Sequence, residues 1–242
     1  MDNSRVAVTA ETLELLRQAS TATITTELFR HGLRNAFLAG LRPLNPHVAR
    51  FAGEAFTLRH IPAREDLDVP GVTANPEHPQ RKAFETVGPG QVLVMDCRGE
   101  IRNACGGQIL ITRMMKRGAA ALVTDGALRD SPGLAQMDFP VFAGGVAATL
   151  SLARHHAVDL QVPVCCAGVP VYPGDILVGD EEGVVCVPRH LAAEIAAPAA
   201  QRERLEEFLL AKVEEGAPLR GTYPPDERTL AEYEAWRRRR GS

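Results

Sequence analysis

The segment QVLVMDCRGEIRNACGGQILITRMMKRGAAALVTDGALRD, residues 91–130, contains two apolar runs of strand length separated by a helical pattern. The first run, residues 91–96, follows the turn signal Gly88-Pro89-Gly90, which predicts that a buried strand begins there. The second run, residues 119–124, is too short for a packed helix and predicts another buried strand.

Between these runs, Gly106 and Gly107 precede a helical pattern at residues 108–117. Its last turn is rich in arginine and lysine, and Gly118 follows, as is typical of a helix C-terminus. Strand, helix and strand form one βαβ unit, and such units connect right-handedly into a parallel sheet. The sequence therefore predicts an α/β fold.

Ligands of open α/β sheets bind beyond the carboxyl ends of the strands. We therefore expect Cys97-Arg98-Gly99, the helix start at Gly106-Gly107, and residues 125–130 to share one crevice. A helix N-terminus offers unpaired N–H groups and a partial positive charge, and the two glycines let an anion approach the backbone. This combination predicts a binding site for a small anion.

Arg129 and Asp130 supply charged groups to this predicted site. The planar guanidinium of Arg129 matches a carboxylate bidentately, which a lysine does not. Asp130 is a hard oxygen donor suited to Mg²⁺ or Mn²⁺, and such a cation polarises the keto oxygen of a 2-oxo acid and stabilises an enolate. We thus predict a site for a small 2-oxo acid, with a surface ion pair in a turn as the alternative.

Three motifs resemble the RraA-like family: Thr124-Asp-Gly-Ala-Leu-Arg-Asp130, Gly106-Gly107-Gln-Ile-Leu110, and VYPGDILVGDEEGVVCVP at residues 171–188. The resemblance covers about residues 20–195. This family contains proteins named as regulators of ribonuclease E activity and class II 4-hydroxy-4-methyl-2-oxoglutarate aldolases, which also decarboxylate oxaloacetate.

The resemblance implies a swivelling β/β/α domain of the α/β class, here with helical N- and C-terminal extensions. We expect residues 1–242 to form a single RraA-like domain, with a core at about residues 20–195 and a C-terminal helical extension at about residues 191–242. The resemblance also implies a homotrimer or homohexamer with the site between subunits. In the family, an acidic residue from a neighbouring subunit's C-terminal region completes that site.

The family motifs further imply roles for individual residues. Arg129 matches the arginine that binds the pyruvate carboxylate, and Asp130 matches the aspartate that binds the divalent metal. Ile109 and Leu110, next to Gly107, fall where backbone amides complete the carboxylate pocket.

Gln108 departs from the aldolase pattern. In the aldolases an acidic residue stands twenty-one positions before the carboxylate-binding arginine and helps to hold the metal's water shell, and here Gln108 occupies that position. An amide still holds a water but supplies no negative charge. We therefore expect weaker metal binding, and no proton transfer through this residue.

Charge and composition exclude several classes of protein. A formal net charge of −3 gives no long-range attraction for nucleic acid, and the few aromatic residues offer no stacking platform. No run approaches the roughly 18 to 20 apolar residues of a membrane span, and the N-terminus lacks a signal-peptide pattern. Five cysteines without metal-ligand spacing fit a reducing compartment, so we expect a cytoplasmic protein.

Cysteine and histidine positions raise two further questions. Cys97 and Cys105 lie near the predicted crevice, where a nucleophilic thiol is one interpretation and a small buried side chain is the favoured one. His155 and His156 are adjacent, and neighbouring side chains diverge on a helix or strand, so a structural role is favoured over metal binding.

The remaining chain shows helical and hairpin patterns. We predict helices at residues 9–19 and 20–31, the second capped by Ser20, and a long helix at about residues 191–215. Residues 176–178 and 184–187 form a predicted hairpin.

A long loop is predicted at residues 62–77, which are charged and turn-rich, and such loops are often lids. Arg59, His60, Arg64 and Glu65 at its start are candidates for recognising the far end of a substrate, and a solvated surface loop is the alternative.

We therefore predict a divalent-metal-dependent lyase that acts on a small 2-oxo acid through a pyruvate-enolate-type intermediate. Aldol cleavage, oxaloacetate decarboxylation and dehydration of a sugar-derived 2-oxo acid share this chemistry. The alternative is a non-catalytic regulator that binds a ribonuclease. An inhibitor needs neither Arg129 nor Asp130, so the presence of both favours catalysis.

Overall fold

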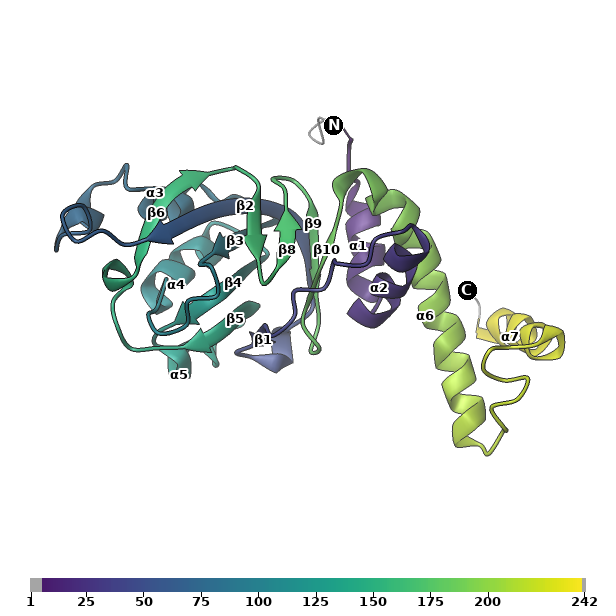
Figure 1. Ribbon diagram of the computed structural model, residues 1–242. Helices are drawn as coiled ribbons and strands as arrows, with labels where there is room; N and C mark the ends of the chain where they lie inside the picture. Colours follow the sequence, from purple (N-terminus) through teal and green to yellow (C-terminus); the bar gives the residue numbers. More distant parts are fainter. Residues whose placement is uncertain (1–5, 241–242) are drawn as a thin grey trace.

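A curled mixed sheet forms the centre of the molecule, as the computed structural model of residues 6–240 shows (Figure 1). In this described part of the chain the sheet has eight strands in the order β1-β5-β4-β3-β2-β9-β10, and β6 also pairs with β2. Strands β2, β3, β4 and β5 run parallel, whereas β1, β6, β9 and β10 pair antiparallel to their neighbours. The strands are β1 (Arg42–Pro43), β2 (Phe51–Pro62), β3 (Gln91–Asp96), β4 (Ala121–Leu128), β5 (Val141–Val146), β6 (His155–Leu160), β9 (Ile176–Gly179) and β10 (Val184–Val187).

Helices cover one face of this sheet and a small hairpin covers the other. Side chains of β3 alternate between the two faces of the sheet. Leu93 and Met95 pack with the helices, and Val92 and Val94 pack toward the hairpin. The helices are α3 (Pro79–Thr86), α4 (Gln108–Lys116) and α5 (Ser131–Leu134), and the hairpin is β7 (Val164–Cys166) with β8 (Val169–Val171). This layering confirms the predicted β/β/α class.

A second helical layer packs on strands β9 and β10. Leu16, Ile24 and Leu28 are fully buried there against Val178 and Val185. The helices are α1 (Ala10–Gln18), α2 (Thr21–Arg30) and the first half of α6 (Ala192–Glu214). The Ser20 side chain accepts the Thr23 N–H, which confirms the predicted cap.

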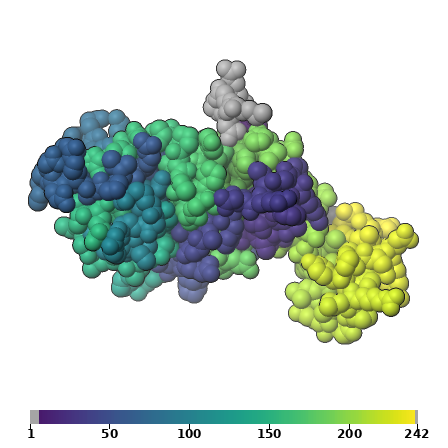
Figure 2. All heavy atoms as spheres, in the orientation of Figure 1, coloured from purple at the N-terminus to yellow at the C-terminus, as the bar shows by residue number. Residues whose placement is uncertain are grey.

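The second half of α6 leaves the body and carries α7 (Glu227–Arg240), so the two form an arm that stands apart from the sheet (Figures 1 and 2). A small apolar cluster of Phe208, Leu209 and Tyr233, joined by Trp236, holds α7 onto α6. The predicted helical extensions at both ends are thus confirmed. Division of the chain into a core at 20–195 and an extension stays a prediction.

Most predicted elements occur close to their expected bounds. The βαβ unit is confirmed as β3, α4 and β4, but β4 begins two residues later than predicted and continues four residues further, through Asp125. All eight residues of β4 are buried, and Asp125 is tolerated there because backbone N–H groups bind its carboxylate. The predicted hairpin is β9–β10, and residues 63–78 form the predicted loop, interrupted by the short 3₁₀ helix η3 (Val72–Ala74).

Further short 3₁₀ helices are η2 (Pro46–Val48) between β1 and β2, η4 (Ser151–Ala153) between β5 and β6, and η5 (Arg189–Leu191) between β10 and α6. Within residues 6–240, no helix has the length and apolar character needed to cross a membrane. The four cysteines other than Cys165 are buried, and all five are free thiols.

His60 on β2 is a buried imidazole whose titration should govern stability in acid. Its Nδ1 lies 3.0 Å from the backbone oxygen of Asp96, and its Nε2 has no hydrogen-bond partner among the described residues. Burial, together with the neighbouring His155 ring, lowers the pKa of His60 from 6.5 to about 3. The folded protein thus binds fewer protons here than the unfolded chain between these pH values, so stability is lost as the pH falls through them.

We expect the free energy of unfolding to fall by several kcal/mol between pH 7 and pH 4, measured by urea titration. The His60→Gln variant should lose much of this pH dependence, because a glutamine does not titrate. His47→Gln changes an exposed histidine and should leave the pH dependence intact. If His60→Gln and wild-type protein show the same slope, His60 is not the group responsible.

Candidate active site

The chain brings Arg129 next to the start of helix α4 through backbone pairing. Residues just before α4 run beside the end of β4: the Cys105 N–H donates to Ala127 O at 2.8 Å, and the Arg129 N–H donates to Gly106 O at 3.1 Å. The helix N-terminus and the residues that follow β4 therefore meet, as the sequence predicted for a βαβ unit.

Two side-chain contacts and the local backbone conformation position Asp130. Its Oδ2 accepts the Gln108 backbone N–H at 3.1 Å, and its Oδ1 lies 3.5 Å from Arg129 Nε. Its backbone adopts the left-handed conformation, with φ of 60°, at the N-terminus of α5. The carboxylate is 41% exposed, so a cation from solvent can reach it.

Gly107 is required by the close approach of these side chains. A Cβ atom at this position would lie 2.6 Å from Asp130 Oδ2 and 2.9 Å from Arg129 Cγ, both of which are shorter than van der Waals contact. A side chain here would therefore displace the arginine and the carboxylate from the helix start.

These residues line a cavity of about 400 Å³. Arg129, Asp130, Gly106, Gly107, Ile109 and Leu110 form one part of it. Gly107, the N-cap residue of α4, has no side chain to cap the helix, and Asp130 accepts the N–H of Gln108, which leaves the following N–H groups of the first turn for a ligand. The volume lies near the lower end of the range of about 300–1,000 Å³ for small-molecule sites.

The side chain of Gln108 lies beside this cavity and does not line it. A Cβ at Gly133 would come 2.2 Å from Gln108 Oε1, so the amide is folded onto the start of α5. Gln108 contacts Asp130 through its backbone N–H. Its predicted role as the residue that orients a metal-bound water stays a prediction.

Some of the residues that we expected in one crevice with Arg129 lie outside the cavity. Cys97, Arg98, Gly99 and Asp125 do not line the cavity; they form a separate turn, in which Asp125 accepts the N–H groups of Cys97 at 2.6 Å and Gly99 at 2.9 Å. Burial raises the pKa of the Asp125 carboxyl and of the Cys97 thiol. A buried thiol with a raised pKa is a poor nucleophile, which supports the interpretation of Cys97 as a core side chain.

The four residues predicted to recognise the far end of the substrate also lie outside the cavity. Arg59 pairs with Asp159, Arg64 pairs with Asp66, His60 is buried under β6, and none of these, nor Glu65, lines the cavity. The loop itself does line it, through Pro70, Gly71 and Thr73, and helix α3 adds Gln80 and Arg81. Sequence analysis missed Arg81 because it lies in a charged stretch with no recognisable motif.

Comparison with known proteins decides the family. The family model described as RraA-like, Aldolase/RraA, matches residues 21–186. The chain belongs to the RraA-like family.

Two RraA-like relatives carry aldolase names. A putative 4-hydroxy-4-methyl-2-oxoglutarate aldolase of Halalkalibacterium halodurans is 32% identical over 127 residues, 52% of this chain and 60% of that protein, so the match spans less than two thirds of the relative. A 4-hydroxy-4-methyl-2-oxoglutarate aldolase of Thermus thermophilus is 35% identical over 141 residues, 58% of this chain and 77% of that protein.

One solved RraA-like structure carries a different description. RraAS2 of Streptomyces coelicolor, described as an unusual member of the RNase ES inhibitor RraA protein family, aligns with a TM-score of 0.72 and 32% identity. The alignment covers 83% of this chain and 96% of that one, which confirms the RraA-like fold.

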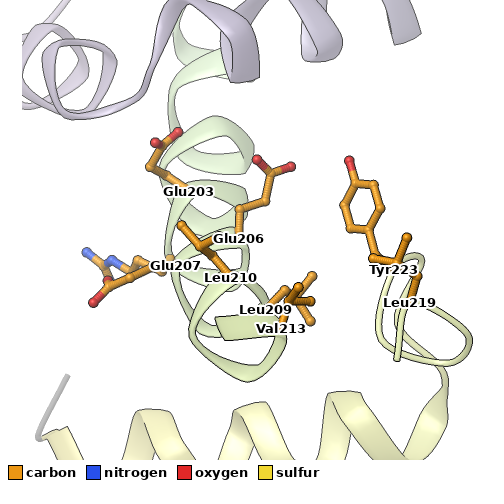
Figure 3. A pocket seen from close by; sticks show the side chains of 9 residues that line it. Glu203, Glu206, Glu207, Leu209, Leu210, Val213, Leu219 and Tyr223 are labelled. Atoms are coloured by element: carbon orange, nitrogen blue, oxygen red, sulfur yellow. The ribbon is translucent and has the colours of Figure 1, made fainter. Parts of the chain in front are cut away.

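The arm of this RraA-like chain contains a second, larger cavity of about 720 Å³ (Figure 3). Its lining includes the apolar side chains of Leu209, Val213 and Leu219, together with Glu203 and Glu206 of helix α6. It adjoins neither Arg129 nor Asp130. We assign no chemistry to it.

Proposed function

We propose that this RraA-like protein is a divalent-metal-dependent lyase that acts on a small 2-oxo acid. The observation that carries the proposal is the arrangement of Arg129 and Asp130 against the N-terminus of helix α4 in one cavity. A guanidinium, free N–H groups and a hard oxygen ligand are what a chelating 2-oxo acid requires.

The donor set fits Mg²⁺ or Mn²⁺ held mainly by water and substrate. Asp130 is the one carboxylate that lines the cavity, and residues 6–240 contain no cluster of three or more potential protein ligands. Mg²⁺ is commonly bound through one or two carboxylates, with water or substrate completing the shell. When bound, such a cation supplies Lewis-acid polarisation of the keto oxygen and stabilises enolate charge.

The protein's own groups would then bind and orient the substrate. Arg129 pairs with the carboxylate next to the keto group through two parallel N–H bonds, which fixes the plane of the 2-oxo acid. The backbone N–H groups of Ile109 and Leu110 add donors at the positive end of α4. Both residues line the cavity, and Ile109 is 84% exposed.

A metal-supplemented screen of the purified protein tests this proposal. The substrates are oxaloacetate, aldol-type 2-oxo acids and deoxy-sugar 2-oxo acids, each with Mg²⁺ or Mn²⁺ and with chelator as control. We expect turnover of at least one class that is lost on chelation.

The second candidate function is inhibition of a ribonuclease, and the similarity to RraAS2 favours it. If no substrate class is turned over and the protein slows ribonuclease cleavage, then the regulator is the better assignment. Loss of inhibition should then map to exposed residues outside the cavity rather than to Asp130.

Assembly is a further part of the proposal. The arm exposes Leu210, Leu219 and Tyr223, whose apolar surfaces have no cover within the described chain (Figure 3). We expect these side chains to contact a second copy, and the protein to sediment as a trimer or a multiple of three. Leu210→Asp with Leu219→Asp should shift the sedimentation coefficient toward that of the monomer. An active monomeric wild-type protein would contradict a site shared between subunits.

A further inference from the structure

We propose that Gln80 is a positioning residue of the candidate site. Its side-chain amide fixes the backbone that leads into helix α4, so that the N–H groups at the start of this helix face the bound carboxylate. The inference rests on the proposed function, because it takes the cavity beside Arg129 as the substrate site. It adds to that site a residue of helix α3, which lies outside the βαβ unit.

Gln80 connects two walls of the cavity. It lies in the first turn of α3 and lines the cavity, although it is only 4% exposed. Its Nε2 donates to the backbone oxygen of Cys105 at 2.6 Å. Cys105 is followed by Gly106 and by Gly107, which is the N-cap residue of α4. One side chain thus joins α3 to the residues from which α4 begins.

The backbone before α4 depends on this donor. Strand β4 and the residue after it bind the neighbouring groups: the Cys105 N–H donates to Ala127 O at 2.8 Å, and Gly106 O accepts the Arg129 N–H at 3.1 Å. The carbonyl between these two groups belongs to Cys105, which is fully buried, and Gln80 supplies its donor. A buried carbonyl without a donor is costly, so loss of the Gln80 amide should shift this backbone.

The other polar contacts between α3 and α4 in residues 6–240 lie at the far ends of the two helices. Arg113, in the last turn of α4, lies 2.8 Å from Glu85. Arg117 Nε donates to the backbone oxygen of Val87 at 3.1 Å, and these two residues are the C-caps of the helices. Removal of the Gln80 amide should therefore loosen the start of α4 while its end stays held.

Gln80 has one competing role, which is to stabilise the fold without affecting the site. A purely stabilising contact leaves the ligand affinity of the folded protein unchanged, whereas a positioning contact changes it. Asn45 is a matched control for this distinction. It is another buried amide, 1% exposed, whose Nδ2 donates to the backbone oxygen of Met137 at 2.8 Å, and it does not line the cavity.

The experiment combines calorimetric titration of the intact protein with pyruvate at saturating Mn²⁺ and hydrogen exchange of the ligand-free protein. Gln80→Met keeps the length of the side chain but removes the donor. We expect it to lower pyruvate affinity at least about tenfold, because small displacements of binding groups are costly, and to speed amide exchange in residues 104–110. Asn45→Leu should lower the free energy of unfolding but change neither pyruvate affinity nor exchange in this segment.

Gln80→Glu tests whether the donor itself is responsible. Burial keeps a carboxyl group protonated to higher pH, and a protonated carboxyl can donate to the Cys105 oxygen, whereas a carboxylate cannot. We expect Gln80→Glu to bind pyruvate more tightly than Gln80→Met at pH 6 and to lose this advantage at pH 8. Equal affinities of the two variants at pH 6 would contradict a role for the donor.

Arg129→Gln separates this inference from the proposed function. If Arg129→Gln leaves pyruvate affinity unchanged, or wild-type protein does not bind pyruvate, the proposed function fails and the inference fails with it. If pyruvate binding depends on Arg129 but Gln80→Met binds pyruvate as tightly as wild type, or Asn45→Leu weakens binding equally, the inference alone is overturned.

Discussion

Asp130→Asn should abolish metal-dependent turnover and lower Mn²⁺ affinity by at least about a hundredfold. Mutation of residues that only hold a metal's direct ligands in place already lowers metal affinity or activity by roughly 10–100-fold. An amide oxygen is neutral and is a weak ligand for a hard cation. The variant should fold, because asparagine also adopts the left-handed backbone found at this position and its oxygen can still accept the Gln108 N–H. Calorimetric titration with Mn²⁺ and a turnover assay measure the two effects.

Asp138→Asn is a matched control for this change. Asp138 is exposed, lies in the same segment after β4, and does not line the cavity. Removing its charge should leave metal affinity and turnover unaltered. Equal Mn²⁺ affinity in wild type and Asp130→Asn would place the metal elsewhere.

Arg129→Lys should reduce kcat/KM for the best substrate at least roughly tenfold. Lysine keeps the charge but loses one of the two parallel N–H bonds, and a hydrogen bond to a charged group is worth about 1.5–3 kcal/mol. Arg129 is 43% exposed, and among residues 6–240 its guanidinium has one ion-pair contact, at 3.5 Å to Asp130, so we expect the variant to fold.

Arg113→Lys provides the corresponding control on helix α4. Arg113 is exposed and pairs with Glu85 away from the cavity, so its replacement should leave the steady-state kinetics unaltered. Wild-type kcat/KM in Arg129→Lys would remove the carboxylate-binding role from Arg129.

The sheet and its first helix were predictable because their signals are local. Buried strands at β3 and β4 are continuous apolar runs, and α4 lies between glycines that mark its two ends. The extension of β4 to Leu128 was not predictable, because Asp125 and Gly126 resemble a turn. Only the fold supplies the Cys97 and Gly99 N–H groups that pair with the Asp125 carboxylate.

The candidate site was predictable only on its βαβ side. Arg129, Asp130 and the glycine-rich helix start belong to one βαβ unit and the turn that follows it, and parallel-strand geometry places them together. The residues on the other side of the cavity come from loop 63–78, α3 and η4. These elements approach the βαβ unit through long-range packing. The Asp68 carboxylate, for example, anchors the loop to His156 at 2.8 Å across 88 residues of sequence. The periodicity of a sequence does not predict such a contact.

The coupling between metal and 2-oxo acid can be measured directly by titrating wild-type protein with Mn²⁺ in the presence and absence of pyruvate. If Asp130 and Arg129 hold the two partners of one chelate, each partner must tighten the other, typically by about 5–150-fold. We expect pyruvate to raise Mn²⁺ affinity within this range, and Arg129→Gln to remove the increase. The same Mn²⁺ affinity with and without pyruvate would contradict a metal-dependent 2-oxo acid site at Arg129 and Asp130.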